Sequence, residues 1–503
     1  MKAFRFGPTM LLGLALGLGV LADLLLRETP WGLNAALWAL SFAGVILILM
    51  RSATSQLIAG WEIALVVVAL CGVTIAWRDA PMLAVFDFFA AAAGGLLLTM
   101  RTPAMDLRRV QITDLIIGSI GSLIDAILGA AGLIFSDLKT DLPRAERTGK
   151  KGMEVMRGGL LALPLILLFG SLFVAADALF EHVVLEVLNI NFAELFCHFF
   201  TIAFVTWVMG GILRERFLTG TRSWSIQTPR KGFSLGFTEI AIILGSVVFL
   251  SLAFVLTQFV YLFGGSQYVL GAEALTVAEY ARRGFFELVV VSGLTLPVLL
   301  LAEWILRKEN PAHIRWFRIL AGAELLLLLI IMLSAMHRLY LYQMEFGLTQ
   351  LRVYASTVLL WLAVVFVWFT LTVMRGRRDR FAFGAFASGV VLLLLLHMVN
   401  PDDLIVRTNV ARYGEGKELD AKYMSRLSAD AVPRLLSSLS EIPEPERGKL
   451  AARLLRMGDR LEEGDWRSWN YSRSRARSLL EEHRERLEKE AEGWTDSSSQ
   501  HGR

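Results

Sequence analysis

Residues 317–340 read FRILAGAELLLLLIIMLSAMHRLY, a run of apolar side chains that contains a single acid, Glu324. A helix needs about 20 such residues to cross roughly 30 Å of hydrocarbon. Inside a bilayer every backbone N–H and C=O group has to be paired, and a continuous apolar run achieves this as a helix. This stretch therefore predicts a transmembrane helix.

Similar runs fill the rest of the first 400 residues. Of the 503 residues, 55% are hydrophobic and 19% are charged, and the mean hydropathy is +0.55, which is typical of a membrane protein. The fold class predicted is an all-α polytopic transmembrane bundle of about 11 spans with a small α-helical C-terminal extramembrane domain. The predicted spans are 8–26, 31–50, 57–77, 81–100, 158–180, 192–213, 237–263, 284–306, 317–340, 351–374 and 381–399.

The first of these runs, 8–26, follows Lys2 and Arg5 and so resembles a signal peptide. It is long for the apolar region of such a peptide, and no A-x-A-like cleavage site follows it. We therefore interpret it as an uncleaved first span.

Lys and Arg gather in four segments, 139–157, 214–231, 307–318 and 375–380, which alternate with poorly basic loops such as 181–191. By the positive-inside rule these four face the cytoplasm. The amino terminus is then cytoplasmic and the C-terminal domain extracytoplasmic. The membrane predicted is the inner, cytoplasmic membrane of the cell. Since this topology accounts for the net charge of +4, we predict no nucleic-acid partner.

This topology requires that residues 111–136 do not cross the bilayer. Asp114, Gly118, Ser122, Asp125 and Gly129 form a small and polar stripe at helical spacing, which predicts an in-plane or re-entrant helix. A twelfth span is the alternative, and it would invert one half of the topology. The predicted organisation is N-terminal transmembrane helices (1–110), amphipathic helix and basic loop (111–157), transmembrane core (158–399), helical extracytoplasmic domain (400–492) and disordered tail (493–503).

The C-terminal region begins with Asn400-Pro401-Asp402-Asp403, which has the form of a helix start, because Asn caps, Pro suits the first turn and acids favour the positive end of the helix dipole. Further on, Trp466, Trp469 and Tyr471 alternate with arginines. Such a surface fits lipid headgroups or an anionic polymer. Packing in the domain's own core is the alternative that we favour.

No residue pattern predicts a cofactor or a metal. Cys71 and Cys197 each lie within an apolar run, so no disulfide framework is indicated. Glu194 and His198 are one helical turn apart, but no HExxH motif or third ligand accompanies them. Glycine-rich nucleotide loops and a G-x-S-x-G elbow are also missing from the sequence.

Ionisable residues beside spans are candidate sites because they are costly in a membrane. Glu194, His198, Glu287 and Arg338 are all predicted at the outer side, where they would form a polar pocket if the helices bring them together.

Four segments carry a resemblance: AEYARRGFFEL (278–288), HRLYLYQMEFGLTQLRVYA (337–355), NPDDLIVRTNVARY (400–413) and LDAKYMSRLSADAVPRLLSSL (419–439). Together they resemble a bacterial polytopic membrane protein family known only as domain of unknown function 4173. The resemblance implies a cytoplasmic membrane, many spans and a helical C-terminal region, and no reaction. It draws attention to Tyr280, Arg283, Glu287, Arg338, Tyr342, Thr349, Arg352, Asn400, Asp402, Arg407 and Asn409.

Three functions remain open, in order of preference. The first is a non-enzymatic envelope sensor, scaffold or assembly component, and the second is a transporter or lipid-handling protein. The third is an enzyme acting on a lipid-linked envelope substrate, with Glu194 or Glu287 as base and Arg338 or Arg352 binding phosphate. The partners predicted are membrane lipids and an envelope protein or lipid-linked ligand.

Overall fold

The computed structural model describes residues 6–52, 60–99, 107–137, 158, 162, 165–166, 168–177, 182, 191–218, 235–263, 285–306, 310–462 and 465–492. Among these residues regular structure is helical, and β-structure is limited to one isolated bridge between Leu235 and Leu306. The helices are α1 (Pro8–Leu26), α2 (Leu33–Ser52), α3 (Trp61–Trp77), α4 (Pro81–Thr99), α5 (Ile112–Gly132), α9 (Phe192–Phe217), α10 (Phe237–Phe263), α13 (Phe285–Ile305), α14 (Pro311–Phe346), α15 (Gln350–Thr372), α16 (Phe381–Val399), α17 (Pro401–Gly414), α18 (Ala421–Met424), α19 (Val432–Ser438), α20 (Glu446–Glu462), α21 (Tyr471–Glu482) and α22 (Arg484–Ala491).

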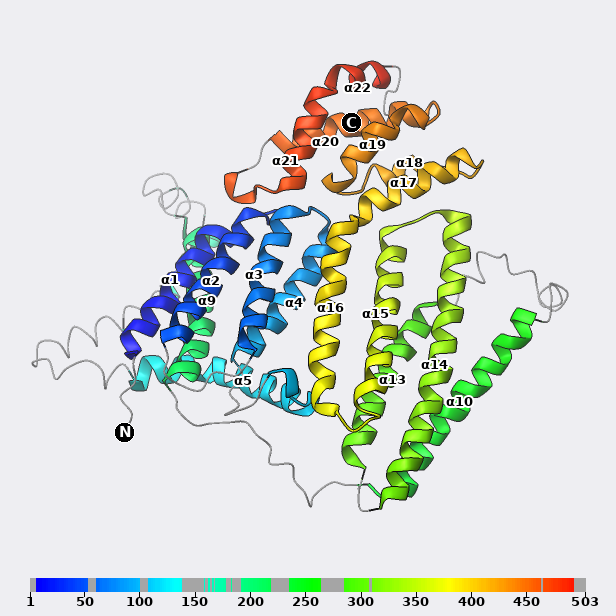
Figure 1. Ribbon diagram of the computed structural model, residues 1–503. Helices are drawn as coiled ribbons and strands as arrows, with labels where there is room; N and C mark the ends of the chain where they lie inside the picture. Colours follow the sequence, from blue (N-terminus) through cyan, green and yellow to red (C-terminus); the bar gives the residue numbers. More distant parts are fainter. Residues whose placement is uncertain are drawn as a thin grey trace, which may run out of the picture.

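The chain is an all-α polytopic bundle, as predicted. Helices α1–α4, α9, α10 and α13–α16 run up and down, and α17–α22 form a C-terminal domain over one end of them (Figure 1). By length and composition, ten helices in the described part of the chain qualify as spans; α5 is one of them, and α3, at 17 residues, is a shorter apolar helix. The predicted span 158–180 lies largely outside the described residues.

Two Asn-Pro pairs start helices at the ends of the bundle. The Asn310 side chain accepts a hydrogen bond from Ala312 N at 2.9 Å before α14, and Asn400 accepts one from Asp403 N at 3.3 Å before α17. Each Asn satisfies an amide that the first helical turn leaves without a partner, and each following Pro has no amide to satisfy. The helix start predicted at Asn400 is confirmed.

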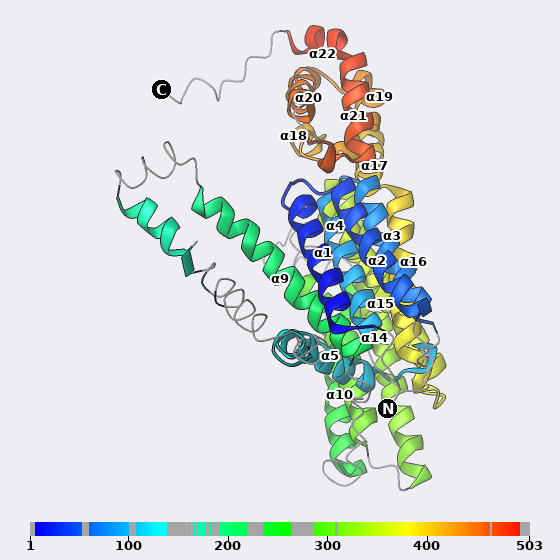
Figure 2. The same cartoon turned by 90° about the vertical axis from the view of Figure 1, so that its left-hand side faces the viewer.

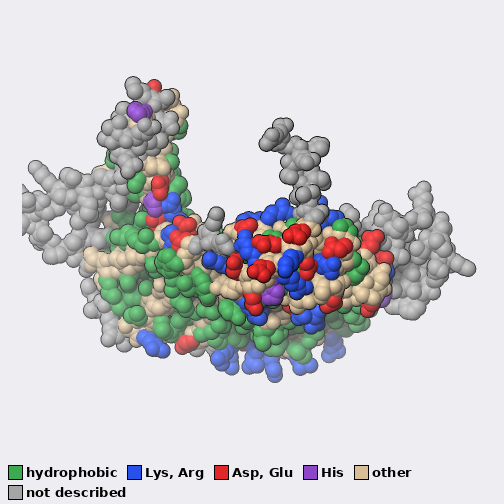
Figure 3. All heavy atoms as spheres, turned by 90° about the horizontal axis from the view of Figure 1, so that it is seen from above, with side chains coloured by type: hydrophobic (Ala, Val, Ile, Leu, Met, Phe, Trp, Pro, Cys, Tyr) green, Lys and Arg blue, Asp and Glu red, His purple; other side chains and the backbone are tan. Residues whose placement is uncertain are grey.

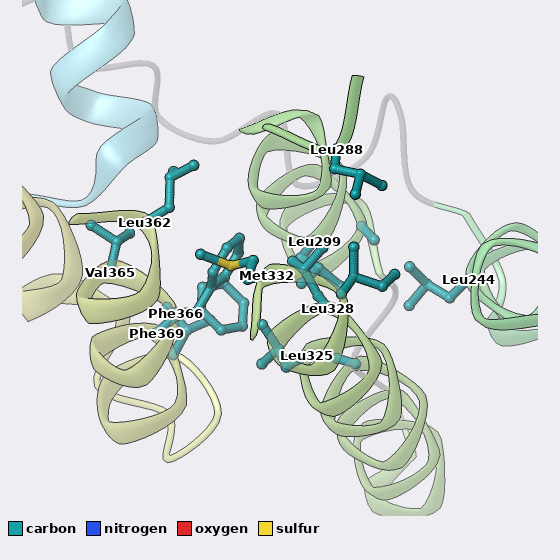
Figure 4. Close-up of a cluster of buried hydrophobic side chains, with 14 of the residues drawn as sticks. Leu244, Leu288, Leu299, Leu325, Leu328, Met332, Leu362, Val365, Phe366 and Phe369 are labelled. Atoms are coloured by element: carbon teal, nitrogen blue, oxygen red, sulfur yellow. The ribbon is translucent and has the colours of Figure 1, made fainter. Parts of the chain in front are cut away.

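Two apolar cores hold the spans together. One joins α1, α2, α3 and α9 around residues such as Leu11, Leu49 and Leu213. The other joins α10, α13, α14 and α15, where Met332 meets Phe366 and Phe369 (Figure 4). We call these two groups of helices the N-half and the C-half. Large apolar side chains also cover the outside of the bundle, as expected of helices whose solvent is lipid.

Helix α5 lies across the ends of the spans, at the opposite end from the C-terminal domain (Figures 1 and 2). Its small residues, including Gly118 and Gly129, are buried, while Ile120 and Leu128 are exposed. Close packing of α5 on α9 depends on Gly211, because a Cβ there would overlap Ala126 O. The position of α5 across the helix ends agrees with the predicted in-plane helix, although α5 has the length and composition of a span.

Replacing Gly211 with Ala should therefore destabilise the protein by about 1–3 kcal/mol, since the added methyl group forces two helices apart. The matched control is Gly245→Ala in α10, where a Cβ would meet nothing within 4 Å. On helix propensity alone both substitutions would stabilise by up to about 1 kcal/mol. Thermal unfolding in detergent measures the difference, and equal midpoints for the two variants would contradict the close α5–α9 contact.

Candidate functional site

The C-terminal domain has an apolar core of its own, built from residues such as Ile405, Leu435, Leu450 and Leu480. It contacts the bundle at three turns: α1–α2 (27–32), α3–α4 (78–80) and α14–α15 (347–349). The buried polar groups at these turns form the candidate functional site, which we call the docking network.

Asp430 is the centre of the docking network. Its carboxylate accepts hydrogen bonds from Asp79 N at 2.8 Å and Ala80 N at 3.0 Å, and Arg78 Nη1 lies 3.3 Å away. Arg78 has extended backbone, so the amides that follow it point out of the turn instead of continuing α3. Ser472 Oγ lies 2.5 Å from the same carboxylate. With four donors around it, the buried Asp430 is fully compensated.

The same turn is held from the other side by α21. The Asn470 amide donates to Ile75 O at 2.8 Å and to Arg78 O at 2.9 Å. These carbonyls belong to the end of α3, where a helix leaves its last C=O groups without intrahelical partners. Asp79 in turn accepts from Ala429 N at 3.1 Å and pairs with Arg473 at 2.7 Å. The domain thus caps the end of the short apolar helix α3.

A second set of contacts holds the α14–α15 turn. The Asn409 side-chain amide accepts a hydrogen bond from Leu348 N at 2.7 Å and donates one to Leu348 O at 2.9 Å. It thus pairs with the Leu348 backbone as a peptide group of a neighbouring strand would. The Arg412 guanidinium donates twice to Met344 O, at 3.1 and 2.7 Å, at the end of α14. Both side chains come from α17, so this helix fixes the turn.

Asp402 joins the second set of contacts to the domain. It accepts from Gln350 Nε2 at 2.8 Å, from Ser428 Oγ at 2.6 Å and from Ser428 N at 2.9 Å, while Gln350 N donates to the Tyr423 hydroxyl at 2.7 Å. Burial raises the pKa of Asp402, and the hydrogen bonds from Ser428 and Gln350 oppose that shift. Burial also raises the pKa of Asp79, against the effect of Arg473.

Directly beneath the network, the bundle contains a buried acid–base pair. His397 Nε2 lies 3.0 Å from Asp87, which also accepts from Thr74 Oγ1 at 3.0 Å, and both members of the pair are 1% exposed. Arg78 links this pair to the domain, because its Nε donates to His397 O at 2.9 Å. The polar contacts therefore run without a break from the domain into α4 and α16.

The structure does not bring the predicted outer pocket together. Glu194 and His198 lie on α9, where His198 Nδ1 is 2.6 Å from Asp23 of α1. Glu287 and Arg338 lie on α13 and α14 in the C-half, on the other side of the bundle (Figure 1). Glu287 is exposed and Arg338 is buried. The four residues fall into two separate groups because α9 packs on α1 and α5 instead of on α13 or α14.

The remaining predicted site residues divide differently. Arg407 is exposed, and Tyr280 and Arg283 lie outside the described residues. Arg352 contacts Gly347 O and lies over the Tyr342 ring, 4.1 Å from its centroid, at the α14–α15 turn. The members of the predicted set that meet at the docking network are Tyr342, Arg352, Asn400, Asp402 and Asn409.

The aromatic residues of the C-terminal domain correct a second expectation. Trp466 is 64% exposed, and Trp469 and Tyr471 are each 45% exposed, so packing in the domain's own core is wrong for all three. The core is filled by aliphatic side chains, Ala and Met from α17 to α22 instead. These aromatics are surface residues.

The central residues of the docking network were missed by sequence reasoning: Arg78, Asp79, Asp430, Asn470 and Ser472. A usable signal is the turn Arg78-Asp79-Ala80-Pro81, which places two charges in a very short connection between two apolar runs. Among the described residues no group of three or more His, Cys, Asp or Glu side chains could hold a metal ion.

A family model described as Domain of unknown function (DUF4153) matches residues 65–438. Its number is 4153, not the 4173 expected from the sequence motifs. The match includes Arg78, Asp402 and Asp430, but it ends before Asn470 and Ser472. Comparisons with curated proteins and with solved structures give no match.

Asp430→Ala should loosen the C-terminal domain from the bundle, because it leaves two buried amides and Arg78 without their acceptor. The expected loss of stability is about 3–5 kcal/mol, the range for breaking a buried charged pair. Hydrogen exchange should rise at residues 78–80 and 470–473 while the domain's own helices stay protected.

The matched control is Asp459→Asn, which removes an exposed partner of Arg484 in the same domain. It should cost at most about 1 kcal/mol. If Asp430→Ala exchanges no faster than this control at the α3–α4 turn, Asp430 is not the centre of the contact.

Proposed function

Because this chain belongs to the family described as a domain of unknown function (DUF4153), a name that assigns no activity, we propose its function from geometry. The protein is a non-enzymatic component of a bacterial cell envelope, a sensor, scaffold or assembly factor. Its membrane bundle holds the C-terminal domain in a fixed position for a partner or ligand.

The docking network carries this proposal. The polar atoms of Asn409, Arg412 and Asp402 are hydrogen-bonded to other parts of the same chain. An enzyme site at this position would need polar groups that point at a substrate, whereas these groups join one part of the protein to another. Side chains that are satisfied internally on both sides of a contact support a rigid unit.

The exposed face of the C-terminal domain supports a binding role. Seen from above, it carries interspersed positive and negative side chains (Figure 3). Ion pairs such as Arg484–Asp459 and Arg486–Glu490 lie on this surface and contribute little to stability. Charged surfaces of this kind contribute mainly to the rate and specificity of partner association. An envelope protein or a lipid-linked ligand is the partner we propose.

The proposed orientation follows from charge. Basic residues on the described helix ends gather at the end of the bundle that also carries the start of α1, opposite the C-terminal domain (Figure 1). By the positive-inside rule that end is cytoplasmic, so the C-terminal domain lies outside the cytoplasmic membrane. The basic residues concerned include Arg214, Arg216, Arg315, Arg318, Arg375, Arg377, Arg378 and Arg380.

Reporter fusions test this orientation. A reporter that is active only outside the cytoplasm should work when fused after Gly414 and fail when fused after Gly376, because one helix, α16, separates the two positions. A reporter active only inside should give the reverse. Activity of the external reporter after Gly376 would place the C-terminal domain in the cytoplasm and move the search for a partner there.

A transporter is the second candidate, and one observation favours it. Glu324 is 1% exposed between α10 and α14, where it accepts a hydrogen bond from Ser251 Oγ at 2.9 Å. An acid inside a span is a default candidate for ion or proton movement. The docking network has no direct part in such a path.

Crosslinking in cells, combined with flux measurements, separates the two functions. A photoreactive amino acid at Glu481, on the domain surface, should capture a defined partner, and Asp430→Ala should lower that yield at least about tenfold because the domain is no longer held in place. Asp459→Asn should leave the yield unchanged.

Purified protein in liposomes should show no gradient-driven flux of ions, lipids or amphiphiles. A flux that Glu324→Gln abolishes and Asp430→Ala preserves would establish the transporter and reject the scaffold.

A further inference from the structure

The aromatic side chains of segment 466–471 form a surface that the proposed function does not use. It comprises η7 (Trp466–Ser468), Trp469, Asn470 and Tyr471, and its three aromatic side chains are all exposed. A contiguous group of exposed aromatics in a folded domain usually marks a contact with a protein or a membrane.

This segment lies against the ends of two candidate spans, α1 and α2, and of the shorter apolar helix α3. Trp469 O accepts from Leu33 N, the first residue of α2, at 2.7 Å. Arg467 donates to Leu24 O near the end of α1 at 2.8 Å, and Asn470 caps the end of α3. The backbone of the segment is therefore level with the first and last turns of transmembrane helices.

Because the segment contacts the ends of membrane helices, its aromatic rings are at the level expected of the lipid headgroups. Each headgroup layer adds roughly 5–7 Å to the hydrocarbon core, about the length of an indole side chain. Leu24, whose carbonyl holds Arg467, is 55% exposed, so a lipid-facing side of α1 borders the segment. Trp31, in the α1–α2 turn, is 42% exposed at the same level.

We propose that Trp466, Trp469 and Tyr471 are an interfacial anchor, seated in the headgroup layer of the bilayer that the bundle itself spans. Indole and phenol rings favour this layer because one part of the ring is apolar and the other donates hydrogen bonds. The occupant of this surface is lipid, since the surface continues the lipid-facing side of α1 and α2.

The one charged residue within the segment, Arg467, is compensated by acids. The Arg467 guanidinium pairs with Asp465 at 2.7 Å and with Glu28 at 3.0 Å, so two acids compensate it. A basic patch would depend on anionic lipid and on salt. The aromatic anchor is expected to bind zwitterionic and anionic leaflets alike.

The test places a fluorescent probe on the segment in the full-length protein. Cys71 and Cys197 are replaced by Ser, and single cysteines are introduced by Trp466→Cys and, separately, Trp469→Cys, so that each variant keeps the other indole. The control is Arg486→Cys on α22, the helix of the domain farthest from the bundle (Figure 2). Each carries the fluorophore NBD in phosphatidylcholine vesicles, with or without phosphatidylglycerol.

A lipid with a doxyl quencher near its headgroup should remove about half or more of the fluorescence at 466 and 469 and little at 486, with or without phosphatidylglycerol. Equal, weak quenching at all three positions would overturn the proposal. So would a probe shielded from aqueous iodide yet untouched by doxyl lipid, since another protein or a second copy of the chain would then cover the segment. Quenching only with phosphatidylglycerol would replace the aromatic anchor by an electrostatic one.

Discussion

The architecture of the protein depends on how one buried carboxylate, that of Asp430, is compensated. A carboxylate that is 3% exposed carries a desolvation cost of several kcal/mol unless donors surround it. Here two of the donors are the backbone amides of Asp79 and Ala80, which an α3–α4 turn of extended geometry exposes. These bonds fix where the C-terminal domain seats on the bundle.

The same contact joins the two halves of the bundle. Helices α4 and α16 lie between the N-half and the C-half, and the buried apolar cluster that joins them to α15 is small: Ala80, Leu83, Tyr354, Leu393 and Leu396. The C-terminal domain grips the α3–α4 turn on one side of this cluster and the α14–α15 turn on the other. Since apolar burial gives little advantage between helices in lipid, polar bonds at the helix ends have a large role in holding the halves together.

Sequence reasoning predicted the spans because their cause is local. The bilayer demands an apolar run of a given length and a paired backbone, and both conditions can be checked within about 20 residues. The helix start at Asn400 is local in the same way, since the cap bond to Asp403 spans three residues. In the described part of the chain, nine of the predicted spans are apolar helices long enough to cross a membrane, whereas α3 is shorter and α5, predicted not to cross, also has the length and composition of a span.

The docking network was missed because its partners are far apart in the chain. Arg78 and Asp430 are separated by 352 positions, and nothing in either neighbourhood specifies the other. The predicted pocket of Glu194 and Arg338 failed for the same reason, because it assumed that residues at one depth are also neighbours around the bundle. Depth follows from hydrophobicity, whereas lateral position follows from which helix faces pack.

Polar residues beside a membrane have two uses, as ligands for other molecules and as bonds within the protein, and hydrogen-bond satisfaction distinguishes them. The polar atoms of Asn409 and Asp402 form hydrogen bonds within the chain. By contrast, Glu324 Oε2 and His397 Nδ1, both buried in the bundle, have no hydrogen-bond partner among the described residues. Unsatisfied buried groups are costly and call for a reason. These two unsatisfied groups lie within the bundle, whereas the polar groups of the docking network hold the C-terminal domain against it.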